Sequence, residues 1–238
     1  MTSNSAAGWA LIAAVVIGFV ASLITPGGLL VEPTDTAAFS EAAGVLGNNS
    51  ELAQFATFAL VVSIVLYWFG LSSLRRAFSG DSVMDTVSRF ALNIFLLGYV
   101  ILIVELSFRH ILTHVLAHGV GSSASEEKAM AVTLFAAAAG LHIAFLYVSS
   151  IGSTVFAYGL ARRSASMDIF QLASWGLALT GLAIFIVLMV AEHMPDVDLH
   201  GVAVASNLML LFASLCIVVI AVGIMRGRRE FVGDDAAA

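Results

Sequence analysis

Residues 51–76 read ELAQFATFALVVSIVLYWFGLSSLRR, an apolar run with a glutamate at its first position and two arginines at its last. A helix needs about 20 consecutive apolar residues to cross the hydrocarbon core of a bilayer. Backbone N–H and C=O groups cannot stay unpaired in lipid, so a run of this length is predicted to be helical. The segment therefore predicts a transmembrane helix whose basic end marks one side of the membrane.

Five further stretches of the chain have the same apolar character. The six predicted spans are 8–30, 52–74, 89–117, 128–161, 168–191 and 202–225. We expect an all-α fold, a polytopic transmembrane bundle of six helices that forms a single domain over residues 1–238. The first run follows an uncharged start and ends without a small-residue cleavage site, so it is predicted to be a retained span and not a signal peptide.

The composition agrees with lipid as the outer solvent of this bundle. Hydrophobic residues make up 60% of the chain and charged residues 11%, whereas a soluble domain carries about 25% charged residues. The spans leave no separate domain to carry a basic patch, so the lipid bilayer is the expected partner and nucleic acid is not. The one cysteine, Cys216, excludes an intrachain disulfide and is predicted to be a small core residue.

Basic residues are sorted to alternate connections between the predicted spans. If the chain crosses the membrane six times, eight of the ten basic residues fall on one side, and acidic residues dominate the other. Lys and Arg gather on the cytoplasmic side of membrane proteins. We therefore expect a bacterial-type inner (plasma) membrane protein with both termini cytoplasmic. The eight residues are Arg75, Arg76, Arg89, Arg162, Arg163, Arg226, Arg228 and Arg229.

The third and fourth spans are longer than a bilayer requires. About 20 residues after Arg89 the chain should leave the hydrocarbon near Arg109, and the same count back from Arg162 gives an exit near His142. Both helices are therefore predicted to continue outward as a hairpin that closes at about 119–125. Ser82 with Asp85 and Ser123 with Glu126 resemble capping boxes, which predicts helix starts at these two serines.

One predicted polar cluster lies in this hairpin. Glu105 and Arg109 are four residues apart, so they share a helix face and can form an ion pair. If the hairpin is symmetric about residue 122, His142 lies within one helical turn of the level of Glu105. Ionisable groups at membrane depth are costly and often functional, which favours a proton-binding or ligand-binding site. The alternative is that these polar residues pair with one another and serve only to fix the packing of the helices.

Small residues recur every four positions on the fourth span. Small residues let transmembrane helices approach closely. We therefore expect the fourth span at the centre of the bundle. The residues of this series are Ala136, Gly140, Ala144 and Gly152.

Five histidines are predicted to lie near the outer membrane surface. Three of them are four residues apart on the third span, and two histidines at this spacing can hold one metal ion. A further ligand from the connection between the fifth and sixth spans would complete a Zn or Cu site. The alternative is that these half-apolar side chains simply suit the interface. The five residues are His110, His114, His118, His193 and His200.

The order of features resembles that of six-span bacterial integral membrane proteins of unknown function. The resemblance rests on a short first span, an acidic outer loop, residues 51–76 ending at two arginines, and a basic end after the sixth span. It implies the six-helix membrane fold over most of the chain and implies no activity.

Three functions remain open from the sequence. The absence of catalytic motifs and the small size favour a non-enzymatic accessory or scaffold subunit, packed against other membrane-protein subunits. The histidines favour a periplasm-facing metal or redox site. Glu105 and His142 favour a small transporter in which they relay a proton.

Overall fold

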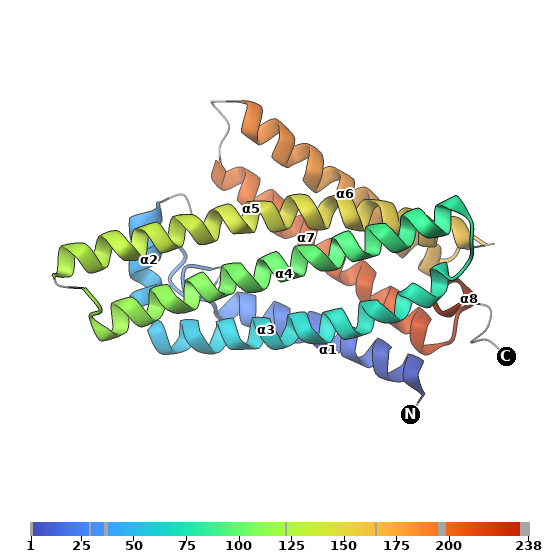
Figure 1. Ribbon diagram of the computed structural model, residues 1–238, viewed down its shortest axis with the longest axis horizontal. Coiled ribbons are helices and arrows are strands. Elements are labelled where there is room, and N and C mark those ends of the chain that lie inside the picture. Colours follow the sequence, from blue (N-terminus) through green and yellow to red (C-terminus); the bar gives the residue numbers. More distant parts are fainter. Residues whose placement is uncertain are drawn as a thin grey trace. The chain divides into compact units, whose positions relative to one another are not determined.

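The computed structural model describes residues 2–28, 30–35, 38–121, 123–164, 166–194 and 199–233, and these residues form helices and connecting turns without a β-strand. Six helices are long and apolar enough to cross a membrane, as predicted. Figure 1 shows their course. The helices are α1 (Ser3–Ile24), α2 (Phe39–Asn48), α3 (Ser50–Ser72), the 3-10 helix η1 (Ser73–Phe78), α4 (Val83–His118), α5 (Ala124–Arg163), α6 (Ile169–His193), α7 (Leu199–Met225) and α8 (Arg229–Val232).

The first helix ends earlier than predicted. It stops at Ile24 and not at residue 30, because Pro26 cannot continue a helix and Gly27 adopts a φ of +80°. The Gly27 N–H then donates to the carbonyl oxygen of Val31 at 2.9 Å, which closes a turn. Residues 25–28 and 30 of the predicted span therefore lie outside the helix, at the start of the loop.

The long loop after α1 contains a helix that the apolar pattern did not indicate. Helix α2 covers ten residues, Phe39–Asn48, and buries Ala42, Ala43 and Leu46. It is too short to cross a membrane, and its buried face is only three residues wide. The loop is therefore helical over these ten residues.

The chain divides into two compact units, which we describe separately. Unit 1 comprises residues 1–15, 65–99 and 146–238, and unit 2 comprises residues 16–64 and 100–145. All eight arginines of the predicted cytoplasmic connections belong to unit 1. Unit 2 holds seven acidic side chains against two basic ones. That the two units act as a single domain stays a prediction.

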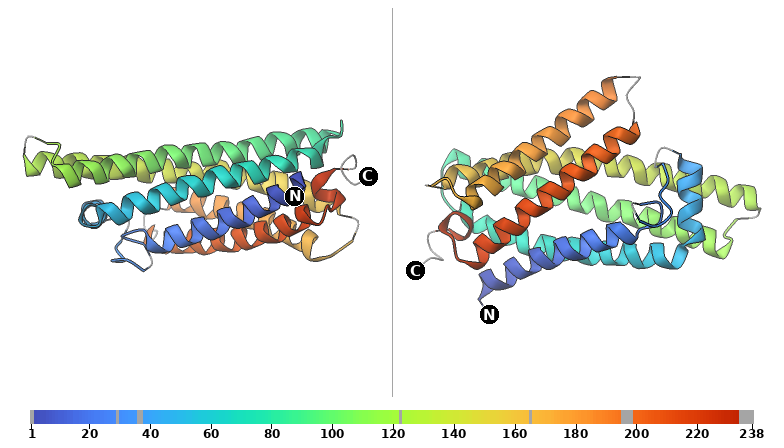
Figure 2. Two further views of the ribbon diagram at one scale, coloured as in Figure 1. Left: turned by 90° about the horizontal axis from the view of Figure 1, so that it is seen from below. Right: turned by 180° about the vertical axis from the view of Figure 1, so that it is seen from behind.

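Unit 1 has a large apolar core. Its fully buried side chains include Phe78, Phe156, Leu92 and Ile217. Helices α6 and α7 lie side by side (Figure 2), and Cys216 is buried among core residues, as predicted. Burying side chains of this size removes much apolar surface from solvent and makes many dispersion contacts, so packing alone can fix the helix arrangement here.

Helices α4 and α5 approach each other closely in unit 1. A Cβ atom added at Gly152 would lie 2.4 Å from the backbone nitrogen of Phe95 and 2.6 Å from its Cα. A Cβ atom at Gly159 would lie 2.1 Å from the Oγ of Ser88. Only glycine fits at such a crossing. The predicted role of small residues on this helix is therefore confirmed at Gly152.

The two described ends of the chain meet at one end of unit 1, as Figure 2 shows. Arg76 in η1 donates from Nη1 to the Oγ of Ser3 at 3.4 Å and to the Oδ1 of Asn4 at 3.5 Å. At the other end of the chain, a Cβ atom at Gly233 would lie 2.6 Å from the carbonyl oxygen of Arg76. Phe231 of α8 is buried, and α8 packs on η1. The start of α1 and the end of α8 therefore both lie beside Arg76.

Unit 2 has a much smaller core. It consists of Ala42, Ala43, Leu46, Ala53, Leu112, Ala131 and Phe135. Helix α2 supplies three of these residues and packs on the hairpin formed by the end of α4 and the start of α5 (Figure 1). A Cβ atom at Gly140 would meet nothing within 4 Å. The expected close approach is therefore wrong at Gly140, which is exposed.

Candidate functional site: the Glu105 cluster

Helix α4 places Glu105 and Arg109 one turn apart on the same face. The Nη2 of Arg109 lies 2.7 Å from the Oε1 of Glu105. The side chain of Glu105 is 1% exposed, whereas that of Arg109 is 26% exposed. Glu105 is therefore a buried carboxylate within a predicted span, paired with an arginine that reaches toward the surface of the unit.

Helix α5 supplies the third member of the cluster. The Nδ1 of His142 lies 2.9 Å from the Oε2 of Glu105, the carboxylate oxygen that Arg109 does not contact. The ring of Phe145 lies beside the imidazole, with centroids 5.7 Å apart. The contacts are those expected from the hairpin register, and the role of these residues as a functional site stays a prediction.

The charges of this cluster are compensated by contacts within the chain. The Nε of Arg109 is buried and makes no hydrogen bond to the described residues. Each carboxylate oxygen of Glu105 has one partner, so the buried charge is compensated within the chain.

The three histidines of α4 lie on the surface of unit 2. The side chains of His110, His114 and His118 are all exposed. The rings of His114 and His118 are in contact, with centroids 4.4 Å apart and planes inclined by 56°. Of the three predicted histidines on α4, the structure thus brings the rings of His114 and His118 into contact.

The two remaining predicted histidines belong to unit 1. The exposed ring of His193 uses its Nδ1 to donate to the carbonyl oxygen of Met189 at 2.7 Å. His200 lies in the first turn of α7, and its side chain, like the acidic residues Asp196 and Asp198, lies outside the described residues. Within the described part of the chain, no group of three or more His, Cys, Asp or Glu residues is arranged to hold a metal ion. The predicted five-histidine Zn or Cu site therefore gains no support and stays a prediction.

A second buried carboxylate, in unit 1, was recognised from the sequence only as a helix cap. The Ser82 hydroxyl accepts a hydrogen bond from the Asp85 N–H at 3.0 Å and donates to the Oδ2 of Asp85 at 2.7 Å. Arg163 of α5 forms an ion pair with the Oδ1 of Asp85. The guanidinium of Arg163 also lies over the ring of Phe78, 5.9 Å from its centroid. The start of α4 is thereby joined to the end of α5.

A third polar contact, also in unit 1, joins the start of α6 to the segment after α7. Asp168 caps α6, and its Oδ1 accepts hydrogen bonds from the N–H groups of Phe170 at 3.1 Å and Gln171 at 3.0 Å. Arg228 reaches the Oδ2 of Asp168 at 2.5 Å and also contacts Glu230. The Gln171 N–H, together with Arg228, lowers the pKa of Asp168 below its usual range. An aspartate before an apolar run is the sequence signal that would have indicated this cap.

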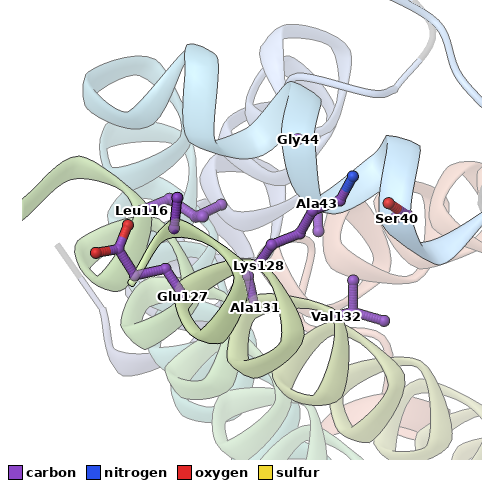
Figure 3. A pocket seen from close by; sticks show the side chains of 9 residues that line it. Ser40, Ala43, Gly44, Leu116, Glu127, Lys128, Ala131 and Val132 are labelled. Carbon is purple, nitrogen blue, oxygen red and sulfur yellow. The ribbon is translucent and has the colours of Figure 1, made fainter. Parts of the chain in front are cut away.

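A pocket of about 280 Å³ lies in unit 2 where α2 meets the α4–α5 hairpin. In Figure 3, Lys128 reaches across it toward α2, while Glu127 points to the other side, beside Leu116. None of the predicted site residues lines this pocket. The lining residues are Ser40, Ala43, Gly44, Leu116, Ala124, Glu127, Lys128, Ala131 and Val132.

No family model, curated protein or solved structure matches the chain. The resemblance to six-span bacterial membrane proteins therefore stays a prediction. The six apolar helices define the class of protein, a multi-pass helical membrane protein.

Proposed function

We propose that this protein crosses a bacterial-type inner membrane six times with both termini in the cytoplasm. Two observations support this orientation. The eight arginines of the short connections all belong to unit 1. Both described ends of the chain lie beside one of them, Arg76. The positive-inside rule assigns such an arginine-rich end to the cytoplasm.

Within that membrane, the protein acts as a non-enzymatic accessory or scaffold subunit of a larger complex. The observation that carries this proposal is the length of α4 and α5, which have 36 and 40 residues. At 1.5 Å per residue they are about 54 and 60 Å long, whereas the hydrocarbon core is about 30 Å thick. The hairpin therefore extends past the lipid and offers a helical surface to a partner.

The surface of this hairpin is partly apolar near its closed end. Ile111 of α4 is 48% exposed, Val120 of the turn 55%, and Met130 of α5 39%. Exposed apolar groups need no explanation in lipid, but outside the bilayer they are available for contact with a partner protein. The carboxylates of Glu105 and Asp85 are each paired with an arginine of the same chain, which suits a role in fixing helix packing.

A photo-crosslinking amino acid placed at Met130 tests this proposal in living cells. We expect a discrete protein adduct from Met130 and only lipid adducts from a matched position, Leu179, which is 59% exposed in the middle of α6. The proposal is wrong if neither position gives a protein adduct and the protein purified in mild detergent is monomeric and copurifies with nothing.

Proton-linked transport is a second candidate, favoured by the 2.9 Å contact between His142 Nδ1 and the buried carboxylate of Glu105. A histidine and a carboxylate in contact within a span can exchange a proton. In proteoliposomes, a pH gradient should then dissipate faster with this protein than without it. Glu105→Gln should abolish the difference, whereas Glu127→Gln at the hairpin tip should not. An unchanged flux in Glu105→Gln would remove this candidate.

A further inference from the structure

The ring pair of His114 and His118 differs from His193 and His142, two other histidines of the described residues. Both rings are exposed, they lie one turn apart on α4, and their centroids are 4.4 Å apart. His193, by contrast, directs its Nδ1 to a carbonyl oxygen of its own helix. His142 directs its Nδ1 to Glu105. We propose that His114 and His118 form a two-histidine binding site for one Cu²⁺ ion, with water in the remaining positions.

The two rings are close enough to share one metal ion. A metal–nitrogen bond of about 2.0 Å places the ion about 3.2 Å from the centre of each imidazole ring. Two imidazoles at a right angle then have centroids about 4.5 Å apart, and two at the tetrahedral angle about 5.2 Å apart. The 4.4 Å separation of the unliganded rings is close to the first of these values, so rotation of the two exposed side chains can bring one nitrogen of each ring to a shared ion. Adjacent ligands at right angles are typical of Cu²⁺, whereas Zn²⁺ prefers a tetrahedral arrangement.

The surroundings of the pair favour a cation. Unit 2 holds seven acidic side chains and only two basic ones, so it attracts positive ions. The carboxylate of Glu127 is at the hairpin turn, with its Oε1 3.4 Å from where a Cβ of Gly119 would lie. Gly119 directly follows His118. Lys128, one of the two basic residues, reaches toward α2 (Figure 3).

The described residues provide only two protein ligands, and this number determines the affinity expected for the metal ion. No third His, Cys, Asp or Glu of the described residues joins the pair to complete a ligand set. The site should therefore bind more weakly than closed sites with three or four protein ligands, and it should follow the order Cu²⁺ over Ni²⁺ and Zn²⁺. The assignment depends on neither the orientation in the membrane nor the accessory role proposed above.

The test uses the full chain without a histidine tag, purified in detergent, freed of metal and titrated with Cu²⁺. Isothermal titration should give one ion per chain, and electron paramagnetic resonance should show coupling to two imidazole nitrogens. His114→Ala and His118→Ala should each weaken binding at least about tenfold, since even outer partners of metal ligands contribute that much. Both residues are exposed on a helix, where alanine is well tolerated.

His110→Ala is the matched control, because His110 has the same spacing to His114 that His118 has. It should leave the affinity and the spectrum unchanged, and so should His193→Ala in unit 1. Binding that survives the loss of His114 or His118, or that falls as much in His110→Ala, would overturn the assignment. So would an affinity for Zn²⁺ equal to that for Cu²⁺.

Discussion

Unit 1 and unit 2 of this chain are stabilised by different kinds of contact. Unit 1 packs large aromatic and aliphatic side chains such as Phe78, Phe156 and Leu92 into an extensive core. Unit 2 has a seven-residue core in which four members are alanine, and it buries the charged side chain of Glu105. A small core stabilises the arrangement of the helices weakly. The paired carboxylate of Glu105 therefore contributes a larger share of that stabilisation in unit 2.

The same comparison applies along a single helix. Helix α5 packs tightly at Gly152 in unit 1 and leaves Gly140 open in unit 2. Polar contacts in unit 1, such as that of Asp85 with Arg163, lie at helix ends around the core. In unit 2 the polar contact of Glu105 with His142 lies between helix interiors. Substitutions that disturb close packing should therefore affect unit 1 most, and substitutions that remove charge should affect unit 2 most.

The largest effect is expected for Gly152→Ala. The new methyl group would lie 2.4 Å from the backbone of Phe95, which cannot move aside without shifting α4. Overpacking of this kind costs about 1–3 kcal/mol or more. Unfolding in mixed micelles, followed by circular dichroism, measures the loss.

Gly140→Ala is the matched control on the same helix. Its methyl group meets nothing within 4 Å, and alanine is the better helix former by up to about 1 kcal/mol. We expect unchanged or slightly higher stability. Equal losses in Gly152→Ala and Gly140→Ala would contradict the assignment of tight packing to unit 1.

The next largest effect is expected for Glu105→Gln. Removing one partner of a buried pair costs about 3–5 kcal/mol, but Arg109 and His142 are each about a quarter to a third exposed, so solvent screening reduces the cost to about 1–3 kcal/mol. Hydrogen exchange should increase over residues 100–118 and 124–145. An increase confined to residues 146–163 would contradict the proposed role of this pair in unit 2.

A smaller, pH-dependent effect is expected for Asp168→Asn. The pKa of Asp168 is lowered in the folded state by the Gln171 N–H and by Arg228, so the ionised form stabilises the fold. This stabilisation is present above the unfolded pKa of about 3.9 and is lost as the pH falls through the lower folded pKa. At pH 7 we expect Asp168→Asn to lower the Tm slightly, because asparagine caps a helix as well as aspartate but lacks the charge that pairs with Arg228. The difference from the unaltered protein should shrink below about pH 4, and a difference that grows in acid would refute this account.

The smallest effects are expected at the two serine caps. Ser82 both accepts from and donates to the buried Asp85, whereas Ser123 accepts from the Glu126 N–H at 3.3 Å and shares its other hydrogen bond, of 3.0 Å, with the exposed hydroxyl of Ser125. Ser82→Ala should cost about 1 kcal/mol and Ser123→Ala about 0.5 kcal/mol. Amide hydrogen exchange in the first turns of α4 and α5 distinguishes the two, and a larger effect at Ser123 would show that the hairpin tip is more tightly held than its contacts suggest.

Much of the fold could be predicted from the sequence because lipid imposes a simple length rule. The apolar runs locate the six long helices, and a helix rises by a fixed amount per residue. That regular rise also allowed the contact of Glu105 with His142 to be predicted from the position of the hairpin turn. The same rule does not find α2, whose ten residues bury only a three-residue face.

The parts that could not be predicted depend on which segments become neighbours. Asp168 and Arg228 are 60 positions apart, and no periodicity connects a helix start to the segment after the last span. Gly140 and Gly152 belong to one four-residue series, yet only Gly152 meets another backbone. A small residue permits the close approach of a second helix, but its presence in the sequence does not show that a helix packs there.

The orientation of the two units in the membrane is tested most directly by cysteine labelling from outside intact cells. Ser79→Cys in unit 1, just after η1, and Ser125→Cys in unit 2, in the first turn of α5, each place a thiol at an exposed position, in a Cys216→Ala background that removes the natural thiol. An impermeant maleimide should label Ser125→Cys in intact cells and Ser79→Cys only after the cells are lysed. Labelling of Ser79→Cys from outside would contradict the assignment of the arginine-rich end to the cytoplasm.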